Sequence, residues 1–117
     1  MTTTPVPRPV THVIFDMDGL LLDTEGFYTE ATQRIVARYG KVFDWSIKAN
    51  MVGRSSLAAA RYLVETLELP LTAEAYLQDR RSLLEARFPE AEPMPGARRL
   101  TDHLHNHGVP MAVASSS

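Results

Sequence analysis

The chain has 117 residues, of which 44% are hydrophobic and 22% charged, and its formal net charge is −2. This length suits one small domain with a modest core, and the charge argues against broad affinity for nucleic acid or an anionic membrane. Cysteine is absent, which excludes disulfide bonds and thiol catalysis.

Residues 1–10 carry three prolines among threonines and predict a mobile tail. They lack the apolar core of a signal peptide, and no apolar run in the chain approaches transmembrane length. We therefore expect a cytoplasmic location.

An apolar strand that ends in carboxylates follows the tail. Thr11–Phe15 reads as a short buried parallel strand, and Asp16 and Asp18 come directly after it. A bare charge is costly to bury, so we expect the strand to present both carboxylates at its carboxyl end, where open α/β sheets bind ligands. Neighbouring carboxylates repel each other unless a cation or proton intervenes, and Mg²⁺ prefers such oxygen ligands.

The order of residues in this stretch suits phosphoryl transfer. An aspartate can attack phosphorus to give an aspartyl phosphate, and a second carboxyl can act as acid and then as base, which are the roles predicted for Asp16 and Asp18. Gly19 would let the backbone turn and bring its N–H, with that of Leu20, near a phosphate. A lone D-x-D is more often a solvated turn or helix cap, but the preceding strand, the glycine and the later Asp-Thr pair oppose that interpretation.

The string VIFDMDGLLLDT (13–24) resembles motif I of the haloacid-dehalogenase (HAD) superfamily, in the subgroup whose helical cap follows this motif directly. The segments RYGKVFDW, MPGARRL and HGVPMAVASSS extend the likeness. The resemblance implies an α/β fold: a HAD-like Rossmannoid core, with only its first two strands present, and an inserted α-helical bundle cap. It also implies a Mg²⁺-dependent phosphatase that acts through an aspartyl phosphate on a small phosphorylated metabolite, with Asp16 and Asp18 at the metal.

Residues 24–91 predict the cap, as a bundle of about four helices with short connections. Each helix is expected to follow a side chain that can cap its N-terminus: Thr24, Asp44, Ser55 and Thr72. Gly40 would close the first helix. Apolar residues at helical spacing predict the inward face: Tyr28, Ala31, Ile35, Tyr39, Leu57, Ala60, Val64, Leu67, Tyr76, Leu77, Leu83, Leu84 and Phe88.

The core is predicted to comprise residues 11–23 and 92–117. Three prolines between residues 89 and 95 mark the return from the cap. Gly96–His107 then reads as a helix with Leu100 among its inward residues, and Val109–Ala114 reads as a second apolar strand.

The end of this second strand should meet the end of the first. Parallel strands joined by a long crossover would bring Ser115 alongside Asp16 and Asp18. A serine triplet alone is typical of a flexible chain end. By resemblance, Ser115 matches the motif II Ser/Thr that binds the phosphoryl group, and Ser116 would contribute its backbone.

Gly53 and Arg54 form a hinge-like loop between two predicted helices. An arginine suits a substrate anion or hydroxyl, and by resemblance such cap loops choose the substrate. An exposed arginine at a helix start is the alternative, and the sequence leaves both open.

Three histidines alternate in the segment HLHNH, residues 103–107. His103 and His107 would share one helix face, a spacing that can bind metal. Solvated histidines near a helix C-terminus, which the helix dipole favours, are the preferred interpretation.

The resemblance ends at motif II. Members of the superfamily also use a downstream lysine and a later acidic cluster that completes the Mg²⁺ site, whereas both lysines of this chain, Lys41 and Lys48, precede motif II. We therefore expect a truncated product of impaired activity, with open sheet edges and an uncovered apolar face. Two other functions stay open: a sugar phosphomutase of the same superfamily and a non-catalytic binding fragment.

Overall fold

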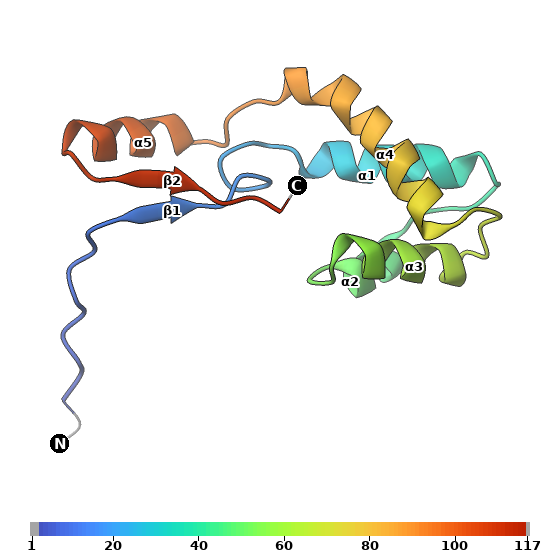
Figure 1. Ribbon diagram of the computed structural model, residues 1–117, viewed down its shortest axis with the longest axis horizontal. Coiled ribbons are helices and arrows are strands. Elements are labelled where there is room, and N and C mark those ends of the chain that lie inside the picture. The colour runs from blue at the N-terminus through green and yellow to red at the C-terminus, as the bar shows by residue number, and fades with distance from the viewer. Residues whose placement is uncertain (1–2, 117) are drawn as a thin grey trace. The chain divides into compact units, whose positions relative to one another are not determined.

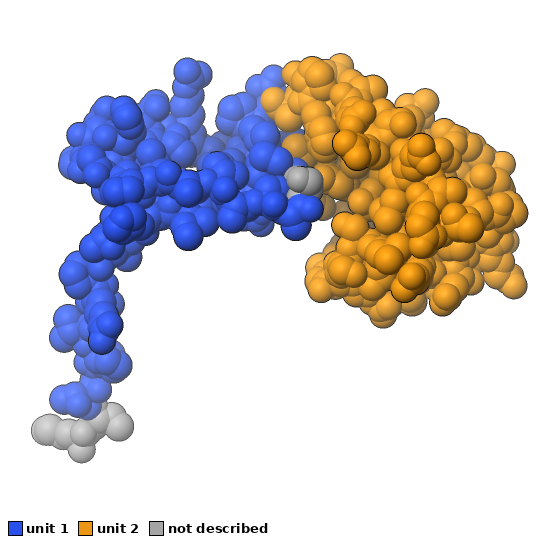
Figure 2. All heavy atoms as spheres, viewed as in Figure 1, with its two compact units in different colours: residues 1–23, 92–117 blue, residues 24–91 orange. Residues whose placement is uncertain are grey.

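The computed structural model describes residues 3–116, which divide into two compact units (Figures 1 and 2). The first unit holds the described residues up to Asp23 together with those from Glu92 onward, and the second unit is Thr24–Ala91. The chain leaves the first unit once and returns to it once. The second unit is therefore an insertion within the first.

A two-stranded parallel sheet and one helix make up the regular structure of the first unit over its described residues. Strand β1 (Val13–Phe15) pairs in register with β2 (Met111–Val113), and helix α5 (Ala97–Asn106) lies before β2 in the chain (Figure 1). The predicted parallel pairing of the two strands is confirmed, although both strands are shorter than predicted.

Backbone hydrogen bonds join the two segments of the first unit that flank the helical insertion, residues 21–23 and 92–94. The N–H of Asp23 donates to the carbonyl of Glu92 at 2.8 Å, and the N–H of Met94 donates to the carbonyl of Leu21 at 2.8 Å. The segment that leaves the first unit and the segment that re-enters it therefore lie side by side.

The second unit is helical. Its elements are α1 (Glu25–Ala37), α2 (Trp45–Met51), α3 (Ser56–Thr66), α4 (Ala73–Arg87) and the short 3₁₀ helix η1 (Phe88–Glu90). This matches the predicted bundle of about four helices. No helix in the described part of the chain is both long and apolar enough to cross a membrane.

Three of the four predicted helix caps form. The side chains of Asp44, Ser55 and Thr72 each accept a hydrogen bond from a backbone N–H in the first turn of their helix. Thr24 occupies the N-cap position of α1, but its side chain makes no capping hydrogen bond. The caps explain why α2, α3 and α4 begin where the sequence predicts.

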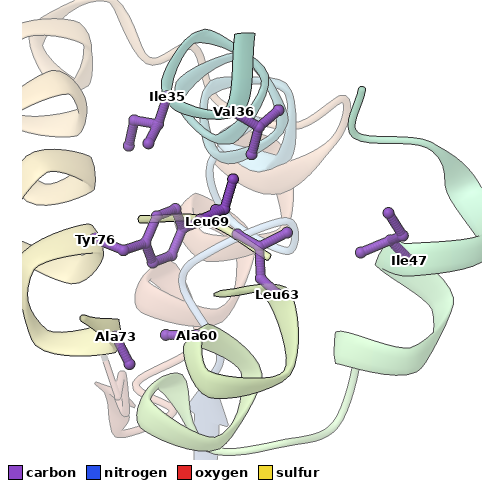
Figure 3. Packing of buried hydrophobic residues seen from close by; sticks show 8 residues of the cluster. All are labelled: Ile35, Val36, Ile47, Ala60, Leu63, Leu69, Ala73 and Tyr76. Atoms are coloured by element: carbon purple, nitrogen blue, oxygen red, sulfur yellow. The ribbon is translucent and has the colours of Figure 1, made fainter. Parts of the chain in front are cut away.

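Buried residues from all four helices form one hydrophobic cluster in the second unit (Figure 3). Its members are Ile35, Val36, Ile47, Ala60, Leu63, Leu69, Ala73 and Tyr76. The phenol of Tyr76 is fully buried and shares a 2.8 Å hydrogen bond with the buried hydroxyl of Thr32, so this polar group costs little to bury. Tyr39 was wrongly predicted to face inward, because α1 ends before it and its side chain is 36% exposed.

The sheet of the first unit keeps an uncovered apolar face among the described residues, as predicted. Ile14 in β1 is 72% exposed, and Ala112, its partner in β2 on the same face of the sheet, is also exposed. Leu100 was wrongly predicted to face inward: it is 49% exposed, and α5 has no buried residue. An amphipathic pattern buries its apolar side only where the chain supplies a partner surface.

Asp44 gives α2 a cap whose strength depends on pH. Hydrogen bonds from the Ser46 hydroxyl and then from the Ile47 N–H hold the pKa of Asp44 below the 3.8 of an unperturbed aspartate. A carboxyl whose pKa is lower in the folded state contributes stability above its unfolded pKa, and that contribution is lost as the pH falls through the folded pKa.

We therefore expect the unfolding free energy to decrease more steeply below about pH 4 in the native chain than in Asp44→Asn, because asparagine caps a helix without titrating. Urea unfolding at neutral and acidic pH measures the difference. The two proteins differ only at residue 44, so the difference between their pH profiles isolates the contribution of Asp44. Parallel pH profiles for the two would contradict the expectation.

Candidate functional site

Strand β1 presents Asp16 at its carboxyl end. Phe15 is the last residue of β1 and is buried, whereas Asp16 is exposed. Phe15 pairs with Val113, and its carbonyl accepts the N–H of Ala114 at 2.9 Å. Asp16 and Ser115 therefore follow neighbouring strand ends at the same edge of the sheet, as the sequence predicted for a parallel pair.

A tight loop follows Asp16. The Met17 carbonyl accepts the N–H groups of Leu20 at 3.3 Å and of Leu21 and Leu22 at 3.1 Å, and the Gly19 N–H donates to the Leu22 carbonyl at 2.9 Å. Gly19 has a φ of 74°, a left-handed conformation that favours glycine. The two N–H groups predicted to hold phosphate thus bond within the loop, and a phosphate that used them would have to replace these bonds.

The Asp16 carboxylate is both oriented and accessible. Its Oδ1 accepts the N–H of Met17 at 2.8 Å, which fixes the direction of the side chain while leaving it exposed to solvent. Asp18 is half-buried and forms an isolated bridge with Leu22 inside the loop. Because a backbone N–H already orients this carboxylate, it need not lose further conformational freedom when a ligand binds. Such preorientation favours nucleophilic attack by the carboxylate in a defined direction.

The residues at this edge offer a metal ion oxygen donors. Among residues 3–116 no cluster of three or more histidine or acidic side chains is present, so Asp16 and Asp18 are the carboxylates that this loop supplies. Mg²⁺ is commonly held by one or two carboxylates together with water and substrate phosphate rather than by a full protein cage. The donor set fits Mg²⁺ in that manner.

Ser115 and Ser116 follow β2 and are both exposed. A shallow hollow of about 210 Å³ in the first unit is lined by residues of β1, β2, α5 and the loop after β1, and neither aspartate is among them. Its lining is mostly apolar: Phe15, Leu21, Thr101, Met111, Ala112 and Val113. None of the predicted site residues lines it.

Gly53 and Arg54 lie in the second unit, in the loop between α2 and α3. Gly53 has a φ of 82°, and the N–H of Arg54 donates to the Met51 carbonyl at 3.2 Å. The Arg54 guanidinium lies over the ring of Tyr62, 4.7 Å from its centroid. This contact restrains an exposed arginine. The sequence does not predict the contact with Tyr62, because Arg54 precedes α3 and helical spacing therefore does not relate the two residues.

Known proteins resemble this chain over nearly its whole length. The family model for haloacid dehalogenase-like hydrolases matches residues 13–117. (DL)-glycerol-3-phosphatase 1, mitochondrial, from Arabidopsis thaliana is 52% identical over 110 residues, which are 92% of this chain and 37% of that protein. The "Probable pseudouridine-5′-phosphatase" of Drosophila melanogaster is 47% identical over 112 residues, which are 96% of this chain and 48% of that protein.

A solved structure shows the same fold. The HAD family hydrolase from Deinococcus radiodurans R1 with bound phosphate and sodium superposes with a TM-score of 0.66 at 25% identity, covering 93% of this chain and 48% of that one. This chain thus spans about half the length of the solved structure, and half or less of the two curated relatives. The family match over residues 13–117 establishes that the chain belongs to the haloacid dehalogenase-like hydrolase family.

Proposed function

We propose that this chain carries the nucleophile of a Mg²⁺-dependent phosphomonoesterase that forms an aspartyl phosphate. The observation that supports this most is the Asp16 carboxylate, exposed at the tip of β1 and oriented by the Met17 N–H. The substrate would be a small sugar- or nucleotide-like phosphate, such as pseudouridine 5′-phosphate. The phosphatase names of two relatives and the phosphate bound in the Deinococcus radiodurans hydrolase support this class.

Asp16 and Asp18 would divide the chemistry between them. An Asp16 oxygen attacks phosphorus, and the bond from phosphorus to the leaving oxygen breaks as Asp18 gives that oxygen a proton. Asp18 then takes a proton from water, which hydrolyses the phosphoryl group from Asp16 and restores both carboxyl groups. Mg²⁺ held by Asp16 and Asp18 would neutralise the negative charge that gathers there.

Other predicted residues would hold the substrate. The Ser115 hydroxyl follows the strand that neighbours β1, where it could donate to a phosphoryl oxygen, with backbone N–H groups of Gly19, Leu20 and Ser116 as further donors. In the helical unit, which would serve as the cap, Gly53 would act as a hinge and Arg54 would bind an anion or hydroxyl of the substrate.

A product assay tests the proposal. The protein is incubated with glycerol 3-phosphate or pseudouridine 5′-phosphate, with Mg²⁺ or with EDTA, and inorganic phosphate is measured. We expect phosphate release that requires Mg²⁺. Release that persists undiminished in EDTA would contradict the metal dependence, and an isomeric sugar phosphate in place of inorganic phosphate would identify a phosphomutase.

A non-catalytic binding fragment is the second candidate, because the sheet face that carries Ile14 and Ala112 is uncovered in the described part of the chain. An apolar face of this kind is typical of a surface that packs against another polypeptide. Partner capture that survives Asp16→Asn, in a chain that releases no phosphate, would favour this candidate.

A further inference from the structure

A pair of histidines lies outside the site described above, at the C-terminal end of α5. His103 is in the last turn of α5 and His107 is its C-cap, and both side chains are exposed. Their rings lie 4.3 Å apart between centroids and are tilted by 39°. The third histidine of this segment, His105, has no ring contact of this kind with either of them, since residues two apart in a helix do not face each other.

A hydrogen bond fixes the tautomer of His107. Its Nδ1 lies 2.8 Å from the carbonyl oxygen of His103, and a carbonyl can only accept, so Nδ1 carries the proton. In the neutral ring Nε2 then keeps its lone pair and is available as a ligand. An N–H donated to a backbone carbonyl is the usual way in which a protein orients a histidine that binds a metal.

We propose that His103 and His107 form a two-imidazole site for a divalent transition metal such as Zn²⁺ or Ni²⁺. A metal at about 2.0–2.1 Å from each nitrogen requires the two donor nitrogens to lie within about 4.2 Å of each other. The ring centroids lie 4.3 Å apart, so rotation of these exposed side chains would suffice to bring one nitrogen of each ring within that distance. Imidazole suits these ions, whereas Mg²⁺ prefers oxygen, so this site is chemically distinct from the pair Asp16 and Asp18.

The surroundings set the strength of the site. No third histidine or acidic side chain joins the pair within the described residues, so water would complete the coordination and affinity would be modest. The partial negative charge at the C-terminus of α5 favours a cation there. Arg99, one turn before His103, opposes it. The pair is therefore expected to bind metal reversibly rather than to hold it as a permanent structural ion.

Titration of the protein with Zn²⁺ in a buffer that does not chelate metal tests the site. The ring C–H signals of the four histidines are followed by NMR, with His12 as an internal reference because it lies before β1. We expect saturable changes at His103 and His107, and none when Mg²⁺ replaces Zn²⁺. Equal changes at His12, or no saturable change at all, would overturn the proposal.

Variants provide the matched comparison. His103→Gln and His107→Gln should each weaken Zn²⁺ binding by at least about 10-fold, and His105→Gln should leave it unchanged. All three side chains are exposed, so helix α5 should persist, which circular dichroism checks. A loss of binding as large in His105→Gln as in the other two variants would also overturn the proposal.

Discussion

Replacing Asp16 with asparagine should lower Mg²⁺-dependent phosphate release by roughly 10³-fold or more, the size of effect seen when a nucleophile is removed. An amide cannot form the acyl phosphate, and the substitution also removes a negative charge that would help to hold Mg²⁺. The rate is measured with saturating substrate in this chain and in any longer form of the protein that contains it.

Asp23→Asn is the matched control, because Asp23 is an exposed aspartate of the same motif whose backbone N–H, rather than its side chain, bonds to Glu92. It should keep the rate within a few-fold. Trapping with beryllium fluoride and mapping the adduct gives an independent readout. An adduct at any residue other than Asp16, or normal turnover by Asp16→Asn, would refute the assignment of the nucleophile.

Leu63→Ala should lower the unfolding free energy of the helical unit by about 2–5 kcal/mol. Leu63 is fully buried in the cluster of Figure 3, so its truncation removes apolar contacts and leaves a cavity among α1, α3 and α4. Urea unfolding followed by far-ultraviolet circular dichroism reports mainly on this unit, since α1 to α4 contribute most of the helical residues described.

Val42→Ala is the control for this substitution. Val42 belongs to the same unit but is 68% exposed, so its truncation should change stability by no more than about 0.5 kcal/mol. If the two variants were equally stable, the cluster around Leu63 would not be the core of the unit.

The helix starts could be predicted because they depend on local chemistry. Asp44, Ser55 and Thr72 each bond to an N–H three residues further along, and that spacing is visible in the sequence. The helix end at Gly40 was predicted only approximately. Gly40 adopts a left-handed φ of 69°, and the backbone N–H of Lys41 donates to the Val36 carbonyl, as expected for a glycine that follows a helix. The helix itself, however, already ends at Ala37.

Features that depend on distant partners could not be predicted. Leu100 fits the inward stripe of α5, yet burial needs a second surface that the described residues do not supply there. At the candidate site the sequence predicted that the ends of β1 and β2 would meet. The sequence did not predict that the Met17 carbonyl would accept hydrogen bonds from three N–H groups, because that arrangement depends on the conformation of the whole loop.

The two hydrogen bonds that pair Asp23 with Glu92 and Leu21 with Met94 have an architectural consequence. Because the segments that flank residues 24–91 are already hydrogen-bonded to each other, a connection of a few residues could replace 24–91 without displacing either segment. The entropy of closing so short a connection is small. Residues 24–91 could therefore be exchanged for the corresponding segment of a homologue without a change in the first unit. Such an exchange would leave Asp16, Asp18 and Ser115 in place, because all three belong to the first unit.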